Sequence, residues 1–440
     1  MTDRCIVMGA AGRDFHDFIT FLRERPQLRV VCFTAEQIPF IDARTFPASL
    51  AGPHYPEGIP IEPESELARL IVEHDVDYVF LSYSDLPHEE VMHKASIAQA
   101  AGASFALLGP KHTQIRSSKP VVSVTAARTG SGKSPLSQAI ARRLADRGVR
   151  AAVLRHPMPY GDLAKQAVQR FATAADLDAH ECTIEEREEY EPYLDLGLVV
   201  WAGVDYPSIL AAAEQEADLI LWDGGNNDTS FVKADLSIVV LDALRPGHET
   251  RYYPGETNLR VADLLVLSKA AQATPEALAA LRATAARTNP DAGIVEADLV
   301  VHAEPEGVIA GKRVLVVEDG PTITHGGMPS GAGLLAATAG GAAEILDPRP
   351  FAVGTIAKAY AAYPHIGPVL PALGYSDAQR HELEATIAAA APDLVVDGSP
   401  AHLDRLLRLE VPVVQVRYRF EARSGPDLFA AVDALLESAT

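Results

Sequence analysis

The segment Thr125-Ala-Ala-Arg-Thr-Gly-Ser-Gly-Lys-Ser134 constrains this chain more than any other feature. The apolar run before it, residues 120–125, predicts a buried strand, and residues 135–147 after it place apolar side chains at helical spacing. A strand, a glycine-rich turn and a helix form a phosphate cradle, in which backbone N–H groups surround one phosphate. The sequence therefore predicts binding of a nucleoside triphosphate, although Ala127 stands where the pattern G-x-x-x-x-G-K-[ST] has its first glycine.

The cradle needs a lysine for the outer phosphates and partners for Mg²⁺. Asp223 ends the apolar run 217–223, where such folds place a Mg²⁺-linked carboxylate. The alternative is that this strand-end acid faces solvent. We expect nucleotide contacts from Thr129, Gly130, Ser131, Gly132, Lys133 and Ser134, and Mg²⁺ ligands from Ser134 and Asp223.

The segment Ser268-Lys269-Ala270-Ala271 lies where guanine-binding relatives carry Asn-Lys-x-Asp. Ala271 replaces the carboxylate that would read guanine, which favours ATP over GTP. The aliphatic stem of Lys269 is expected to flank the base.

Basic residues gather in loops that follow predicted strands. Loops at the carboxyl ends of parallel strands line the binding crevice of a doubly wound sheet, and the guanidinium fork of arginine suits phosphate or carboxylate. The alternative for each residue alone is a solvated surface charge. The residues expected to bind substrate are Arg155, His156, Lys165, Arg245, His248 and Arg251.

The acidic run 185–191 is typical of a solvated helix face. The functional alternative is that Glu188 or Glu189 orients a basic ligand or binds a second metal.

Composition limits the class of protein. The 440 residues are 48% hydrophobic and 22% charged, which describes a globular chain without a membrane-spanning run. A formal charge of −21 argues against nucleic-acid binding, which depends on neutralising phosphates. Cys5 and Cys32 lie in strand-like runs, so we expect small buried side chains rather than a disulfide, and a cytoplasmic location.

Strands alternate with helices along the whole chain, which predicts α/β architecture in three-layer units with parallel sheets. We expect a Rossmann-like domain at residues 1–118, a P-loop domain at 119–308 and a C-terminal α/β domain at 309–440. The turn Gly9-x-x-Gly12 is only part of a dinucleotide fingerprint. The stretch 162–171 is expected to be helical.

Several segments together resemble the cyclic 2,3-diphosphoglycerate synthetase family. The likeness spans nearly the whole chain, and the P-loop is its least specific part. The segments are Gly9-Ala-Ala-Gly-Arg-Asp-Phe15, Thr-Gly-Ser-Gly-Lys-Ser134, Arg155-His-Pro-Met-Pro-Tyr-Gly-Asp162, Glu185-Glu-Arg-Glu-Glu-Tyr-Glu-Pro192, Asp223-Gly-Gly-Asn-Asn-Asp228 and Glu318-Asp-Gly-Pro-Thr-Ile-Thr-His-Gly-Gly327.

The resemblance implies an ATP-dependent ligase that closes an intramolecular phosphoanhydride in 2,3-diphosphoglycerate and releases ADP and phosphate. Lys133, Asp223 and Arg155 would then be the catalytic residues, with Mg²⁺ as the ion and a small phosphorylated anion as substrate. A regulatory P-loop NTPase and a small-molecule kinase remain alternatives, and a kinase would need the same residues up to the last step. Intact Lys133 and Asp223 disfavour a third alternative, a nucleotide sensor without catalysis. Whether the chain forms a homo-oligomer stays open.

Overall fold

The computed structural model describes residues 2–9, 12–36, 44–156, 161–225, 228–324, 327–373, 376–399 and 402–438. The motif residues Ala10, Ala11, 157–160, 226–227 and 325–326 lie outside this described part. Contacts divide the chain into two units, which cut it at points other than residues 118 and 308. Unit 1 comprises Met1–Arg170, Leu198–Ala297 and Arg423–Thr440, and unit 2 comprises Phe171–Gly197 and Asp298–Ala422.

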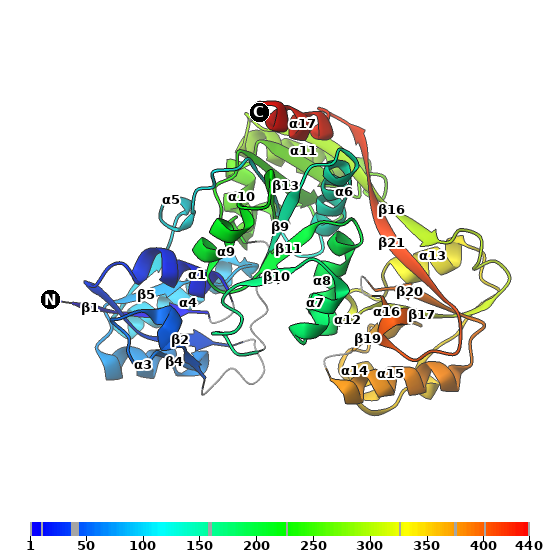
Figure 1. Ribbon diagram of the computed structural model, residues 1–440, viewed down its shortest axis with the longest axis horizontal. Helices are drawn as coiled ribbons and strands as arrows, with labels where there is room; N and C mark the ends of the chain where they lie inside the picture. The colour runs from blue at the N-terminus through cyan, green and yellow to red at the C-terminus, as the bar shows by residue number, and fades with distance from the viewer. Residues whose placement is uncertain are drawn as a thin grey trace. The chain divides into compact units, whose positions relative to one another are not determined.

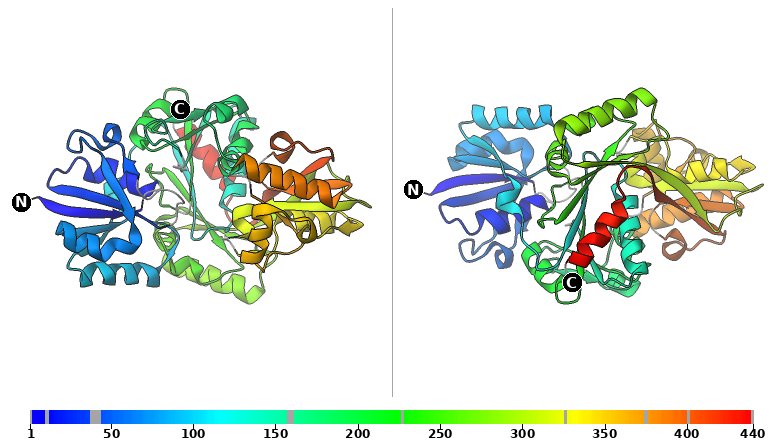
Figure 2. Two further views of the ribbon diagram at one scale, coloured as in Figure 1. Left: turned by 90° about the horizontal axis from the view of Figure 1, so that it is seen from below. Right: turned by 90° about the horizontal axis from the view of Figure 1, so that it is seen from above.

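The N-terminal part of unit 1 is a six-stranded sheet in the order β3-β4-β2-β1-β5-β7. All its pairs are parallel except β3 with β4. Figure 2 shows helices on both faces of this sheet. Alternate residues of β1 enter the two cores, Cys5 and Val7 on one side and Ile6 and Met8 on the other, so the strand reads as one apolar run. The elements are β1 Asp3–Met8, α1 Arg13–Asp17, β2 Leu28–Ala35, β3 Thr45–Phe46, β4 Ile59–Pro63, α3 Leu67–His74, β5 Tyr78–Leu81, α4 His88–Ala100 and β7 Ser104–Leu107.

The P-loop part of unit 1 is a second sheet, in the order β10-β11-β9-β12-β8-β13-β15-β16. Because its central strands are parallel, the loops after β8, β9, β12, β13 and β15 leave from one edge. The strands are β8 Val121–Ala126, β9 Ala151–Arg155, β10 Gln169–Phe171, β11 Val199–Ala202, β12 Leu219–Gly224, β13 Leu236–Asp242, β15 Leu264–Ser268 and β16 Gly293–Glu304. The helices are α6 Lys133–Asp146, α9 Tyr206–Ala213, α10 Gly255–Val261, α11 Pro275–Thr288 and α17 Leu428–Ser438.

The helix expected at 162–171 is wrong. Turns lead there into β10, in which Gln169 and Phe171 are buried and Arg170 is exposed, the alternation of a strand.

Unit 2 carries the parallel strand order β21-β20-β17-β18, with β19 also paired to β17 (Figure 1). The strands are β17 Arg313–Asp319, β18 Glu344–Ile345, β19 Leu370–Ala372, β20 Leu394–Gly398 and β21 Val413–Ser424. The helices are α7 Ala174–Ala179, α8 Ile184–Leu194, α12 Gly320–Ile323, α13 Ala332–Ala339, α14 Gly354–Ala362, α15 Asp377–Ala390 and α16 Leu403–Leu406. The expected α/β architecture with parallel sheets is therefore confirmed.

Shorter elements complete the chain: α2 Ala48–Ala51, β6 Leu86–Pro87, α5 Pro110–Thr113 and β14 Tyr252–Tyr253. Cys5 and Cys32 are buried and free, as expected, and burial raises the pKa of each thiol to about 12. Within the described residues, none of the helices combines the length and the apolar character that crossing a membrane would require.

Candidate functional site

The predicted phosphate cradle has the backbone that the motif requires. Gly130 and Gly132 have φ of 78° and 102°, which residues with a Cβ rarely adopt, and α6 begins directly afterwards at Lys133. Ala127 has a negative φ and is buried, so the first motif position needs no glycine here. Instead, Gly255 packs against the Ala127 carbonyl, which an added Cβ would approach to 2.1 Å.

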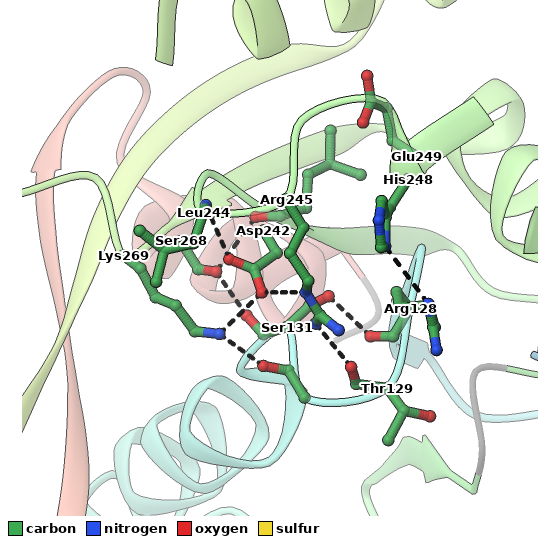
Figure 3. A network of polar contacts seen from close by, with 12 residues as sticks. Arg128, Thr129, Ser131, Asp242, Leu244, Arg245, His248, Glu249, Ser268 and Lys269 are labelled. Carbon is green, nitrogen blue, oxygen red and sulfur yellow. Dashed lines mark hydrogen bonds and ion pairs between the residues drawn. The ribbon is translucent and has the colours of Figure 1, made fainter. Parts of the chain in front are cut away.

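Three side chains hold the carbonyl groups of this loop from outside (Figure 3). Arg245 Nη2 donates to Thr129 O at 2.7 Å, and Lys269 Nζ donates to Gly130 O at 2.8 Å. The Ser268 hydroxyl donates to Ser131 O. A trans peptide directs its C=O and its N–H to opposite sides, so the N–H groups of Gly130 and Gly132 face away from these side chains.

Asp242, at the end of β13, binds two of these three side chains, Arg245 and Lys269. Its Oδ2 accepts from Arg245 Nε and from Lys269 Nζ, both at 2.8 Å. Burial acts to raise the pKa of Asp242, but Lys269 and Arg245 hold it below its usual value. Arg245, which was expected to contact substrate, and Lys269, which was expected to flank the base, thus bind the P-loop. Their contacts with substrate and base stay predictions.

Asp223, at the end of β12, is fully buried and does not face solvent. Lys133 Nζ contacts its Oδ1 at 2.8 Å, Ser137 Oγ donates to the same oxygen at 2.6 Å, and Arg155 pairs with Oδ2. Burial acts to raise the pKa of Asp223, yet Arg155 and Lys133 keep it below the usual value. Burial lowers the pKa of Lys133 to about 8. The structure therefore joins all three expected catalytic residues in one buried cluster.

The donor set suits Mg²⁺ bound together with a nucleotide, because this ion takes one or two carboxylates and completes its shell with phosphates and water. Ser134 is the second residue of α6, and Asp223 supplies the carboxylate. Nowhere in the described ranges do three or more His, Cys, Asp or Glu residues form a potential metal site. Lys133 must leave Oδ1 of Asp223 before an ion can take its place, and the two Mg²⁺ ligands stay a prediction.

His156 pairs with a second buried acid, Asp228, which also binds Arg13 of α1. His156 Nε2 lies 3.0 Å from Asp228 Oδ2, and Arg13 Nε, from α1, donates to Asp228 Oδ1 at 3.0 Å. A Cβ added to Gly12 would come within 2.0 Å of the His156 imidazole, and one added to Gly225 would come within 2.3 Å of the His156 Cβ. Both glycines therefore allow His156 to pack closely. Arg155, the last residue of β9, and His156, which follows it, are thus paired with Asp223 and Asp228, the two ends of the segment 223–228.

Of the remaining basic residues, His248 lies close enough to Arg128, Arg245 and Arg251 to feel their charges. His248 Nδ1 lies 3.4 Å from Arg128 Nη1, and burial together with Arg128 lowers the pKa of His248. Arg251 and Lys165 are exposed. The basic residues of the loop 245–251 therefore lie near one another, and the substrate contacts expected of them stay predictions.

The expectation of a solvated acidic face at 185–191 is wrong. Glu186, Glu188 and Glu191 are buried within unit 2. Glu186 closes a capping box with Thr183, and Glu191 accepts from the N–H of His402 at 3.1 Å. Glu188 shares a hydrogen bond with Asp319, the last residue of β17, whose pKa burial raises.

Two further acids of unit 2 lie at strand ends. Glu318 accepts from the N–H groups of Gly333 and Leu334, at 3.2 and 2.8 Å, and burial raises its pKa. Burial raises the pKa of Asp397 to about 7. Unit 2 therefore holds several buried carboxyl groups that resist ionisation.

Sequence reasoning missed Ser137, Asp242 and Arg13 as site residues. Asp242 carried a usable signal, because it ends a predicted strand as Asp223 does. Ser137 follows the P-loop lysine by four residues, one helical turn, which also could have indicated it.

Comparison with known proteins gives a relative that aligns with nearly the whole chain. The arginine synthetase ArcE of Thermococcus kodakarensis is 55% identical over 425 residues, which cover 97% of this chain and 95% of that protein. The tetraacyldisaccharide 4'-kinase of Anaeromyxobacter dehalogenans is 35% identical over 184 residues, 39% of this chain and 46% of that protein. No protein-family model matches.

Among solved structures, LpxK from Aquifex aeolicus in complex with ATP aligns with a TM-score of 0.44 and 13% identity, over 74% of this chain and 90% of that one. A TM-score at this level does not establish a common fold.

Proposed function

The chain belongs to the family of the arginine synthetase ArcE, and on this premise we propose that it is an ATP-dependent synthetase that forms arginine. The observation that carries the proposal is the 55% identity over 97% of the chain. The ATP requirement follows from the P-loop, and ATP rather than GTP from Ala271.

The chemistry that such a reaction requires is well defined. Arginine differs from citrulline by one terminal nitrogen in place of the ureido oxygen, and that oxygen is a poor leaving group. In the proposed reaction the ureido oxygen attacks the γ-phosphorus of ATP and ADP leaves. Ammonia then adds to the ureido carbon, the C–O bond breaks, and phosphate departs with the former ureido oxygen while a proton is lost.

The residues around Asp223 match the first step. Lys133, the first residue of α6, and Arg155, at the end of β9, both pair with Asp223. Positively charged groups of this kind stabilise charge on a transferring phosphoryl group. Mg²⁺, held by Ser134 and Asp223, would supply further charge neutralisation when bound. Excluding water would protect the phosphorylated intermediate from hydrolysis.

The charge balance also favours a substrate that is not a polyanion. Arg13, Arg155 and Arg245 each pair with a buried aspartate, so much of their charge is already compensated. His248 has a lowered pKa and contributes less positive charge at neutral pH. A substrate with two phosphates and a carboxylate would need more uncompensated cations than these.

A second candidate is the closure of 2,3-diphosphoglycerate to its cyclic phosphoanhydride with release of ADP and phosphate. The specific observation in its favour is the set of motif segments named above, among them Arg155-His-Pro-Met-Pro-Tyr-Gly-Asp162. Substrate binding by Arg155, His156, Lys165, Arg245, His248 and Arg251 belongs to this candidate, as do a cytoplasmic location and a phosphorylated substrate.

One experiment separates the two. The purified protein is incubated with MgATP and either citrulline plus ammonium or 2,3-diphosphoglycerate, and each component is omitted in turn. We expect arginine to form only when MgATP, citrulline and ammonium are all present. Its amount, measured by amino-acid chromatography, should equal the amount of ADP. A phosphoanhydride signal in ³¹P NMR without arginine formation would replace the first function by the second, and ADP formation independent of either substrate would contradict both.

A further inference from the structure

A cavity of about 280 Å³ opens at the amino ends of β1 and β2, opposite the carboxyl end of β1, which leads to Gly9 and α1. Its basic lining residues are Arg4, Arg23, Arg25, Arg29 and His54, with Tyr55 beside them. No acidic side chain contributes to the lining in the part of the chain that the structure describes. This is unexpected in a chain that has 59 acidic and 38 basic residues.

The contacts of these arginines position the guanidinium groups without neutralising them. Arg4 Nη1 donates to His74 O at 2.6 Å, and Arg25 lies 3.8 Å from the centre of the Phe21 ring. Neither a backbone carbonyl nor an aromatic ring carries a full negative charge.

Arg23 and Arg29 follow the same pattern. Arg23 Nη1 donates to Leu50 O at 3.0 Å, and Arg29 lies 5.8 Å from the centre of the Tyr55 ring. Among the residues described, the lining makes one ion pair, between Arg23 and its neighbour Glu24 at 3.4 Å, and the Glu24 side chain is 72% exposed. Exposed pairs of this kind contribute little attraction.

The P-loop edge shows the opposite arrangement. There Arg155 and Arg245 pair with Asp223 and Asp242, whose side chains are 0% and 3% exposed. The same chain thus compensates its arginines at one edge and leaves them uncompensated at the cavity, where an external anion can provide the missing charge.

We propose that this cavity is a second anion site, separate from the P-loop, for a small molecule that carries two phosphate-type groups. Four guanidinium forks around a small volume suit such groups, because each fork can donate two parallel hydrogen bonds. The concave shape and the small volume favour a compact ligand over a nucleic-acid strand. β1 separates Arg4 from Gly9 by five residues, or about 17 Å of strand, so the ligand binds apart from the edge at Arg13.

Calorimetric titration with pyrophosphate tests this site while the P-loop is filled with a non-hydrolysable ATP analogue and Mg²⁺. Arg4 and Arg29 are exposed, so Arg4→Gln and Arg29→Gln leave the core intact. We expect saturable binding in the unaltered protein and in Lys133→Ala, and about tenfold weaker binding in each arginine variant, the loss typical of one charge-assisted hydrogen bond. Arg69→Gln is the matched control, because Arg69 is an exposed arginine of the same sheet domain that pairs with Glu66 and Glu73.

Two kinds of result would contradict the proposed anion site in the cavity. Affinity unchanged in both arginine variants, or lowered equally in Arg69→Gln, rules out binding in the cavity. Tighter binding of polyuridylate RNA or of phosphatidylglycerol vesicles, lost in the same two variants, would assign the cavity to a polymer or a lipid surface instead. Because only binding is measured, the result is independent of the reaction that the P-loop drives.

Discussion

Lys133 and Asp223 lie 90 residues apart in the chain and are joined by a contact of 2.8 Å between Nζ and Oδ1. The same ammonium group donates to the backbone carbonyl of Asp223 at 2.6 Å. The lysine that the motif assigns to the outer phosphates is thus held by an acid until a nucleotide competes for it. Arg155, on the other carboxylate oxygen, keeps Asp223 ionised when Lys133 moves.

Replacement of Lys133 by alanine is expected to lower turnover at least about a hundredfold, because it removes a cation from the phosphoryl transfer. Asp223 keeps Arg155 and Ser137 as partners, so the melting temperature should change by only a few degrees. Lys358→Ala, which removes an exposed lysine of α14 in unit 2, is the control. Unchanged product formation in Lys133→Ala would exclude the P-loop from the mechanism.

Replacement of Arg155 by methionine is expected to lower the free energy of unfolding by about 3 kcal/mol, because it leaves a buried charge with one cation fewer. Arg150→Met is the control, because it breaks another arginine–aspartate pair, that of Arg150 with Asp218 near the start of β9. These two side chains are 68% and 43% exposed, respectively. That control should cost far less than Arg155→Met, because exposed pairs contribute little to stability. Urea unfolding measures both values, and equal losses would contradict the structural role of Arg155.

Replacement of Lys269 by alanine is expected to weaken ATP binding about tenfold through loss of the hydrogen bond to Gly130 O. If Lys269 acts through the P-loop, inorganic tripolyphosphate should lose the same factor, since it has no base. A loss confined to ATP would instead support contact between the lysine stem and the adenine. Equilibrium binding of both ligands distinguishes the two roles.

Replacement of Asp397 by asparagine is expected to change the pH dependence of stability. Burial raises the pKa of Asp397 to about 7, whereas the unfolded chain releases this proton near pH 4. The native state therefore binds more protons between these values, and stability is lost as the pH rises through this window. The free energy of unfolding of Asp397→Asn, relative to the unaltered protein, should increase by about 3 kcal/mol from pH 5 to pH 8. A difference that stays constant would show that Asp397 is ionised in the native state.

Much of the scaffold could be predicted from sequence. The apolar runs 120–125 and 217–223 form β8 and β12 to within two residues, because strands buried on both faces are continuous apolar runs. The short strand β10 was missed, since its three residues carry too little pattern. The burial of Glu188 and Glu191 was missed because their partners, Asp319 and His402, come from distant segments.

The pairing within the site shows the same limit. Residue types and strand ends indicated Lys133, Arg155 and Asp223 as neighbours. That Lys269 would contact Asp242, and Arg13 would contact Asp228, depends on side-chain contacts between residues 27 and 215 positions apart in the chain. No local pattern encodes such contacts.

The most direct test of the proposed reaction follows the ureido oxygen. The protein is given MgATP, ammonium and citrulline labelled with ¹⁸O in the ureido group, and the released phosphate is observed by ³¹P NMR. Phosphoryl transfer to that oxygen predicts one ¹⁸O atom in each phosphate, seen as an isotope shift, together with an equal amount of arginine. Unlabelled phosphate, or labelled citrulline left unchanged while ADP accumulates, would contradict the proposal that this chain forms arginine through a phosphorylated ureido group.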